Sequence, residues 1–212
     1  MNQPQPTALP VAGRRASAWA LFLSLVVIIL ALDLFSKYWS FAKLAEAPVV
    51  VTVENSDQPG TIPFHTPTVV IPSVLNLQLM LNTGAIFGIG KGQRVMFVVV
   101  GLIAIVVIGR LFWKSPAQAR WLHIALGLIL AGAIGNLYDR MRYGAVRDML
   151  HMLPGVKLPF GWRWPIGPNG IDEIYPWIFN IADVSLVCGV ILMLIILWRE
   201  PQPAPANDKA AR

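Results

Sequence analysis

Four long apolar runs dominate the sequence and restrict the folds that are open to it. They lie near residues 18–37, 94–113, 120–138 and 177–198. Each is close to the ~20 residues that a helix needs to cross the hydrocarbon core of a bilayer. Tryptophans, which favour the headgroup region, fall near the ends of these runs: Trp19, Trp39, Trp113, Trp121, Trp177 and Trp198. We therefore predict an all-α integral membrane protein with four transmembrane helices.

The composition excludes the other broad classes of protein. Of the 212 residues, 56% are hydrophobic and only 13% are charged, whereas about a quarter of the residues of an ordinary soluble domain are charged. A disordered chain would carry far less apolar surface. The sequence has no internal repeat, so we expect a single membrane domain over residues 1–212, with a disordered tail at 201–212.

The first apolar run has a second interpretation as a cleaved secretory signal, because Arg14 and Arg15 precede it. The end of the run argues against cleavage, since LFSKYWSF follows Asp33 and offers no small residues for a signal protease. We expect a retained anchor. The single cysteine, Cys188, lies in an apolar run and excludes an intrachain disulfide.

The distribution of Lys and Arg predicts how the chain crosses the membrane. Both sides carry similar numbers of basic residues, but those of the N-terminal tail, the 110–120 loop and the C-terminal tail are far denser along the chain. Dense positive charge marks the cytoplasmic side. Both termini are therefore predicted to be cytoplasmic. The net charge of +6 fits basic ends at anionic lipid and requires no nucleic-acid partner.

Two long loops, at about 39–93 and 139–176, are then predicted to lie on the outer face. Leucines alternate with polar residues over 75–82, the period-two pattern of a half-buried strand. SDQPG at 56–60, between valine-rich segments at 49–53 and 69–71, is typical of a turn in a small sheet. The second loop is rich in Pro, Gly and Trp and predicts an irregular cap at the membrane interface.

Ionisable residues beside the spans are costly and usually mark a functional site. Asp33 and Lys37 have the i,i+4 spacing of an ion pair, and a structural role is as plausible as a chemical one. Asp139 has arginines nearby that neutralise it. Asp183 differs, because no Lys or Arg lies between Trp164 and Trp198.

An unneutralised Asp183 inside a span is expected to have a raised pKa, and a second acid nearby would raise it further. Asp148, outside the third span, can fold back to the same level, and Asn180 lies on the face of the helix that carries Asp183. A structural alternative remains, in which a protonated Asp183 only forms a hydrogen bond with another helix.

Other chemistries find little support in the sequence. His65, His123 and His151 are far apart and no HExxH motif is present, so no metal site is expected. No serine lies in a GxSxG elbow, and Cys188 has no nearby histidine. The glycines of NTGAIFGIGKGQ lack the ending of a phosphate loop. Neither a metal nor any other cofactor is predicted.

Five ordered motifs resemble those of the lipoprotein signal peptidases, also called signal peptidase II. They are DLFSK at 33–37, NTGAIFGIG at 82–90, GNLYDR at 135–140, VRD at 146–148 and FNIAD at 179–183. The resemblance covers about residues 18–198. It departs from the family in two long outer segments and in Arg147, which replaces an expected apolar residue.

The resemblance implies a monomeric aspartic endopeptidase of the bacterial cytoplasmic (inner) membrane, with its active site near the outer face. Its substrates would be diacylglyceryl-modified prolipoproteins, which it would cut just before the lipidated cysteine. Membrane lipid would surround the enzyme. By resemblance, Asp148 and Asp183 are the catalytic pair. The matched substrate-binding or site-shaping positions are Asn82, Asn136, Arg140 and Asn180, and the matched supporting polar pair is Asp33 and Lys37.

Two other classes stay open on the residues alone. In a proton-coupled transporter or channel, Asp33, Asp139 and Asp183 would form a relay spaced through the depth of the bilayer. In a non-catalytic assembly protein, the same polar residues would only join helices. A hydrolytic pair instead requires its acids to gather at one level.

Overall fold

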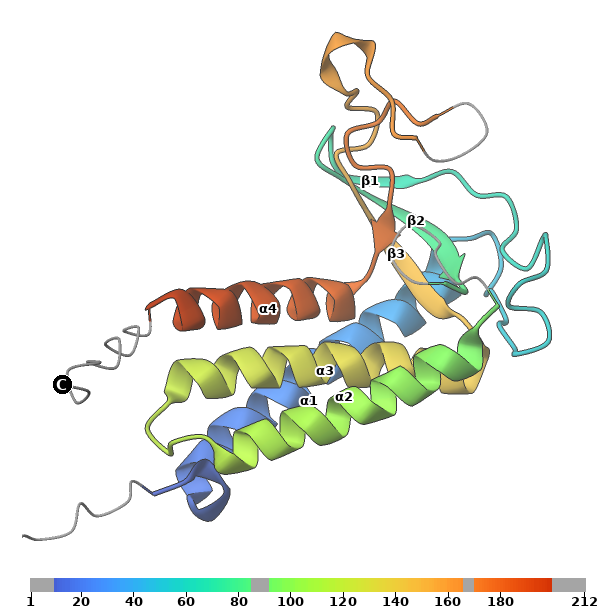
Figure 1. The fold of residues 1–212 in the computed structure, drawn as a ribbon. Helices are drawn as coiled ribbons and strands as arrows, with labels where there is room; N and C mark the ends of the chain where they lie inside the picture. The colour runs from blue at the N-terminus through green and yellow to red at the C-terminus, as the bar shows by residue number, and fades with distance from the viewer. Residues whose placement is uncertain (1–9, 85–91, 166–169, 200–212) are drawn as a thin grey trace, which may run out of the picture.

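The computed structural model describes residues 10–84, 92–165 and 170–199. Four long helices lie side by side, and a small sheet covers one end of the bundle (Figure 1). The helices are α1 (Ala16–Lys43), α2 (Arg94–Lys114), α3 (Arg120–Tyr143) and α4 (Ile181–Arg199). All four are long and apolar enough to cross a membrane, which confirms the predicted four-span architecture. The predicted disordered tail at 201–212 lies outside the described residues.

Three predicted helix boundaries were wrong. Helix α3 continues to Tyr143 instead of ending at 138. The fourth span was predicted to begin at 177, but residues 178 and 179 belong to a strand and α4 begins at Ile181. Pro176 disfavours helix in the residue before it, and Asn180 supplies an N-terminal cap that hydropathy does not register. Helix α1 continues to Lys43 instead of ending at 37, because its last turns are polar enough to escape an apolar pattern.

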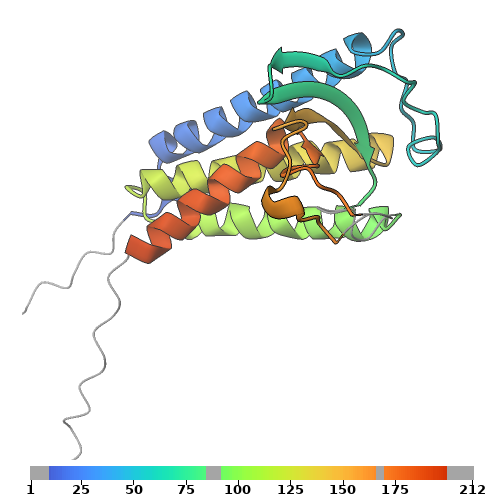
Figure 2. The same ribbon diagram turned by 90° about the horizontal axis from the view of Figure 1, so that it is seen from above.

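The sheet has four antiparallel strands in the spatial order β1-β2-β3-β4. Figure 2 shows from above that the sheet lies at one end of the helices. The strands are β1 (Thr68–Ile71), β2 (Leu75–Asn82), β3 (Val146–Met152) and β4 (Ile178–Phe179). Strand β2 confirms the strand that the alternating pattern predicted at 75–82. Two short 3-10 helices, η1 (Ala12–Arg14) and η3 (Pro159–Gly161), lie in the flanking segments.

The predicted turn at SDQPG is not the turn of the sheet. The β1-β2 hairpin turns at residues 72–74, where the Val74 amide donates to the Ile71 carbonyl and Ser73 has a φ of 59°. Segment 49–53 forms no strand. The Asn55 side chain instead accepts from the Thr52 amide and donates to the Val50 carbonyl, and such local bonds compete with a strand ladder.

The second outer loop rises from the sheet as a ribbon that projects away from the helices (Figure 1). Its two arms are joined by backbone bonds, from the Leu158 amide to the Asp172 carbonyl and from the Ile174 amide to the Val156 carbonyl, both 2.7 Å long. Residues 153–165 and 170–175 therefore have more regular backbone pairing than the irregular cap that the composition predicted.

Helix α3 is the centre of the bundle, because it packs against each of the other three helices. Its contact with α4 is close: a Cβ on Gly132 would collide with the Ala182 carbonyl oxygen and with Ser185. Aromatic packing fills the end of the bundle far from the sheet, where the rings of Phe22 and Phe112 stack 4.0 Å apart. Most remaining large apolar side chains of the helices point outward, as expected for lipid-facing surfaces.

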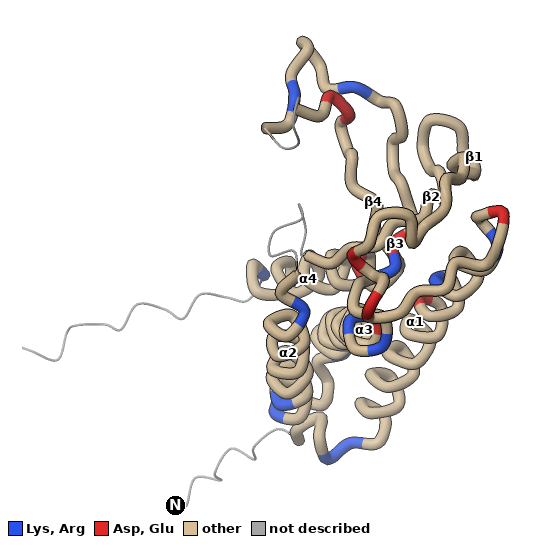
Figure 3. Tube along the Cα trace, turned by 90° about the vertical axis from the view of Figure 1, so that its right-hand side faces the viewer, with Lys and Arg blue, Asp and Glu red and all other residues tan. Residues whose placement is uncertain are grey.

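A buried chain of alternating charges joins α1, α3 and β3. Figure 3 shows where acidic and basic residues lie along the chain. Lys37 Nζ lies 2.7 Å from Asp33 Oδ2 and 3.3 Å from Asp139 Oδ2, and Arg147 Nη2 lies 2.8 Å from Asp139 Oδ1. Three of the four residues are fully buried and Arg147 is 5% exposed. The predicted Asp33–Lys37 pair and the neutralisation of Asp139 by a nearby arginine are both present.

We predict that Asp139→Asn lowers the free energy of unfolding by about 3–5 kcal/mol, because it leaves Lys37 and Arg147 undercompensated in a buried site. Thermal unfolding of the purified protein measures the change. The matched control is Asp172→Asn, which breaks the exposed pair with Lys157 and is expected to leave Tm unchanged. Equal Tm values for the two variants would contradict a structural role for the buried chain.

Candidate active site

Asp183 is held in the first turn of α4 by a reciprocal cap. The Asp183 amide donates to Asn180 Oδ1 at 3.0 Å, and the Asn180 amide donates to Asp183 Oδ2 at 3.1 Å. Such a box satisfies two amides that a helix start otherwise leaves unpaired. The N-terminal end of α4 also favours a negative charge at this position. The sequence FNIAD therefore fixes the Asp183 carboxylate in one orientation.

Asp33 holds the same helix end from α1. Its Oδ1 accepts the Ala182 amide at 2.9 Å, while its Oδ2 accepts from Lys37 at 2.7 Å. Gly135 is needed for this approach, because a Cβ there would lie 2.5 Å from Asp33 Oδ2. The predicted supporting pair thus positions the start of α4, and with it Asp183.

Asp148 lies in the middle of β3 and is 1% exposed. Strand alternation places it on the same face as Val146 and Leu150, two side chains that line a large cavity. Arg147 points to the opposite face, where its backbone and guanidinium bind Asp139. The unusual arginine before Asp148 therefore serves the buried charge chain and does not contact the acid beside it.

Asn180 joins the two predicted catalytic acids. Its Nδ2 donates to Asp148 Oδ1 at 2.6 Å, while its Oδ1 and its amide bind Asp183. The second hydrogen of Nδ2 donates to Asn136 Oδ1 at 3.2 Å, and Asn136 Nδ2 donates to Asp183 Oδ1 at 2.8 Å. The structure therefore brings Asp148, Asp183, Asn136 and Asn180 into one network.

Burial raises the pKa of Asp148 well above its usual value, and the nearby Asp183 carboxylate raises it further. Hydrogen bonds from Asn180 and Asn82 and the charge of Lys37 oppose this shift but are smaller. Asp148 is fully buried, whereas Asp183 lines the cavity. The arrangement suits an acid and base pair that shares one proton.

Asn82 and Arg140 fix the segment that leaves β2 at the site. Asn82 Oδ1 accepts the Gly84 amide at 3.0 Å, and Arg140 Nη2 donates to the Gly84 carbonyl at 2.9 Å. The Arg140 guanidinium also lies 4.9 Å from the centre of the Phe97 ring. Residues 85–90 of the NTGAIFGIG motif lie outside the described residues.

The network opens into a cavity of about 1370 Å³ between the sheet, α2, α3 and α4. Asp183, Asn136, Asn82 and Arg140 line it, whereas Asp148, Asn180, Asp33 and Lys37 lie behind its wall. The rest of the lining is mostly apolar and continues along α4 to Cys188. An extended polar segment at the sheet and a long apolar group along the helices would both fit.

Tyr175 is a site residue that the sequence reasoning did not single out. It lines the cavity, and burial, together with Asp183 and Asp148, raises the pKa of its phenol. The aromatic run IYPWIF before Asn180 was available as a signal, since aromatics beside a catalytic motif often line a pocket. Tyr175 was instead included in the outer loop predicted at 139–176, which was interpreted as an irregular cap.

The sequence matches the family model for signal peptidase (SPase) II over residues 25–199. A lipoprotein signal peptidase of Streptococcus pyogenes serotype M1 is 33% identical, covering 85% of this chain and 94% of the relative. One from Rhodopirellula baltica is 32% identical, covering 91% of this chain and 78% of the relative.

Solved structures agree with this assignment. A bacterial membrane enzyme solved by the in meso method at 2.3 Å resolution matches with a TM-score of 0.62 and 26% identity, over 87% of this chain and 94% of that one. A second such enzyme, at 1.9 Å, matches with a TM-score of 0.60 and 28% identity, over 85% of this chain and 94% of that one. With the acidic network at the mouth of an apolar cavity, these matches show that the chain belongs to the signal peptidase II family of membrane peptidases.

Proposed function

We propose that this peptidase removes the signal peptides of diacylglyceryl-modified bacterial prolipoproteins with an aspartic pair, Asp148 and Asp183, and cuts just before the lipidated cysteine. The observation that carries the proposal is the position of the pair. Both acids bind Asn180 at the polar end of a cavity whose remaining wall is apolar. The relatives that support the substrate class are lipoprotein signal peptidases.

The surroundings of the two acids assign their roles. Asp148 is buried with a raised pKa and carries the shared proton. Asp183 receives hydrogen bonds from Asn136 and from the Asn180 amide, and it lines the cavity, where a bound water can reach its carboxylate. Asp183 therefore takes a proton from a bound water, whose oxygen attacks the scissile carbonyl carbon.

Asp148 then hydrogen-bonds the developing oxyanion and stabilises it. Collapse of the tetrahedral intermediate breaks the C–N bond, and the leaving amine takes a proton from the pair. Because Asp148 lies behind the cavity wall, the substrate must displace its bond to Asn180 Nδ2 to reach it. Catalytic hydrogen bonds commonly rearrange in this way when substrate binds.

The diacylglyceryl group explains the apolar part of the cavity. Burial of acyl chain stabilises binding by ~0.8 kcal/mol per CH2, and α2 and α4 present Val100, Ala104, Val184 and Val187 to the cavity. The chains would then lie between helices while the peptide pairs near the sheet. This arrangement needs neither a cofactor nor a partner subunit.

The placement of the acids disfavours a proton relay. Asp33 and Asp139 are both bound to Lys37 in the buried charge chain, and Asp183 lies at the same end of the bundle. A relay would require acids spaced through the depth of the bilayer. Within the described parts of the four helices, no other Asp or Glu occurs.

We predict that Asp148→Asn and Asp183→Asn each abolish cleavage of a lipidated prolipoprotein peptide by the purified protein, while chelator leaves the wild-type rate unchanged. Asp172→Asn, an exposed substitution on the ribbon, is the activity control. Near-normal turnover by either active-site variant would remove that residue from the pair.

The same two variants are expected to change stability in opposite directions. The pKa of Asp148 is raised in the folded state, so ionisation at neutral pH favours unfolding, and Asp148→Asn removes that cost. A gain of about 1 kcal/mol would raise Tm by about 2–4 °C. Asp183→Asn weakens the α4 cap and lowers Tm. A lower Tm for Asp148→Asn would contradict a buried, protonated acid.

We predict that Cys188→Trp lowers kcat/KM for a lipidated peptide by more than tenfold, because the indole fills the apolar end of the cavity and excludes several CH2 groups. The matched control is Val190→Trp, on the same helix but outside the cavity lining. The same peptide with Ser in place of the lipidated Cys is expected to be cut poorly by all three proteins. Equal rates on lipidated and unlipidated peptides by the wild type would rule out lipid recognition here.

The density of basic residues at the ends of the helices far from the sheet supports cytoplasmic termini and an active site near the outer face of the inner membrane. A reporter fused after Arg212 is expected to be active only in the cytoplasm, and one inserted beside Gln58 only outside. The reverse pattern would put Asp148 and Asp183 on the cytoplasmic side and refute the proposed orientation.

A further inference from the structure

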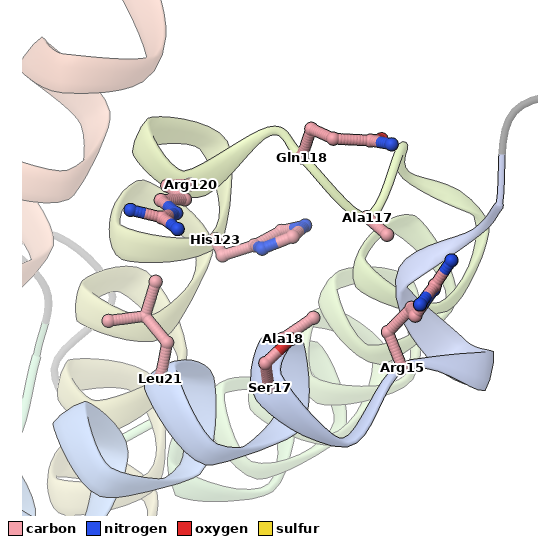
Figure 4. Close-up of a pocket in the computed structure, with 8 residues that line it drawn as sticks. All are labelled: Arg15, Ser17, Ala18, Leu21, Ala117, Gln118, Arg120 and His123. Carbon is pink, nitrogen blue, oxygen red and sulfur yellow. The ribbon is translucent and has the colours of Figure 1, made fainter.

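A second cavity lies at the end of the bundle opposite the acidic pair. It has a volume of about 710 Å³ and is enclosed by the start of α1, the start of α3 and the loop between α2 and α3. Arg15 and Ser17 line it from α1 and its N-terminal flank, Gln118 from the loop, and Arg120 and His123 from α3. Figure 4 shows the His123 ring between α3 and α1, with the two arginines on opposite sides.

The walls of this cavity are held by backbone bonds between distant segments. The Ala12 amide donates to the Ser115 carbonyl and the Ala117 amide donates to the Pro10 carbonyl, both at 2.8 Å. Trp19 Nε1 donates to the Gly13 carbonyl at 3.2 Å, and the Trp19 ring packs on Phe112. The segment before α1 is thereby fixed against the loop, so the cavity is built into the fold.

Positive potential gathers in the cavity from several sources. Neither α1 nor α3 has a side-chain cap at its N-terminus among the described residues, and an uncapped helix start attracts anions. Arg15 and Arg120 take part in no ion pair found within the described residues. The segments 10–21 and 110–124 contain no Asp or Glu. An anionic ligand would complete this site.

His123 adds a separate and more specific requirement. Its side chain is fully buried, yet its Nδ1 has no hydrogen-bond partner within the part of the chain that the structure describes. Ser115 Oγ donates its hydrogen to the Phe112 carbonyl at 2.7 Å and therefore accepts from His123 Nε2 at 3.0 Å. The proton of the neutral ring is then on Nε2, and Nδ1 is an acceptor on a side chain that lines the cavity.

We propose that this cavity binds the headgroup of an anionic phospholipid that carries both a phosphate and a hydroxyl. The phosphate lies between the guanidiniums of Arg15 and Arg120 and the two helix starts, and the headgroup hydroxyl donates to His123 Nδ1. The level of the site fits a lipid, since Trp113 and Trp121 are exposed beside it, as at a membrane interface. Leu21 lines the cavity and Ile28, two turns further along the same face of α1, is 56% exposed, which offers a surface for the acyl chains.

The test measures lipid binding to the purified full chain by native mass spectrometry. The probes are phosphatidylglycerol, phosphatidylmethanol and phosphatidylcholine, with glycerol 3-phosphate as a soluble competitor. Phosphatidylmethanol has the charge of phosphatidylglycerol but no headgroup hydroxyl. The wild type is expected to bind phosphatidylglycerol about fivefold or more tightly than phosphatidylmethanol, as one hydrogen bond allows, and phosphatidylcholine most weakly.

Two double variants separate the cavity from general basic charge. Arg15→Gln with Arg120→Gln is expected to weaken phosphatidylglycerol binding by tenfold or more. Arg14→Gln with Lys114→Gln removes the same charge from the same end but touches no cavity lining, and is expected to change binding by less than threefold. Equal losses in the two double variants would overturn the proposal, because they would show attraction to charge alone.

The remaining arms test the hydroxyl and the source of the phosphate. His123→Phe is expected to abolish the preference for phosphatidylglycerol over phosphatidylmethanol while leaving binding of phosphatidylmethanol unchanged. Equal binding of these two lipids by the wild type, a comparison that needs no variant, would refute the role of His123. Displacement of the lipid by micromolar glycerol 3-phosphate would show a site for a soluble phosphate and overturn the assignment to lipid.

Discussion

The buried ammonium of Lys37 is the interaction on which the rest of the active site depends. It lies between the carboxylates of Asp33 and Asp139, at 2.7 Å and 3.3 Å, with no exposure to solvent. The other oxygen of Asp33 caps α4 at Ala182, and Asp139 binds the backbone and side chain of Arg147 in β3. One cation thus links α4 and β3, the two elements that carry the candidate catalytic acids Asp183 and Asp148. Its burial is tolerated because two acids and two bases balance.

Sequence reasoning recovered the parts of this arrangement that are local. Helical spacing indicated the Asp33–Lys37 pair, and hydropathy located all four helices. Both are short-range signals. The cap from Asp33 to Ala182 joins residues 149 apart, and no spacing rule predicts it. Asp148 was predicted to lie in a loop, because the β3 sequence VRDMLHM contains charged residues that are unusual in a buried strand. These charges find partners in Asp139 on α3 and in Asn180 just before α4.

Asn180 shows why an amide between the two acids is chemically apt. Every polar group of its side chain is used, with Nδ2 donating to Asp148 and Asn136 and Oδ1 accepting from Asp183. An uncharged amide can hold two carboxyl groups near each other without neutralising the charge of either one. A lysine or arginine in the same place would neutralise a carboxylate. Burial raises the pKa of Asp148, while Asp183 lines the cavity. Motif resemblance named these residues, but only their hydrogen bonds separate their roles.

The helix N-termini at the two ends of the bundle differ in what compensates their unpaired amides and positive charge. At the sheet end, α4 begins on the internal carboxylate of Asp33 and the amide of Asn180, so its positive end is already compensated within the protein. At the far end, α1 and α3 begin without a side-chain cap in the described structure, and the cations around them have no internal acid. Compensation there must come from water or from anions outside the chain. An end that leaves its positive charge for external anions suits contact with anionic lipid. At the other end, the start of α4 beside Asp148 and Asp183 already has its compensating groups within the protein.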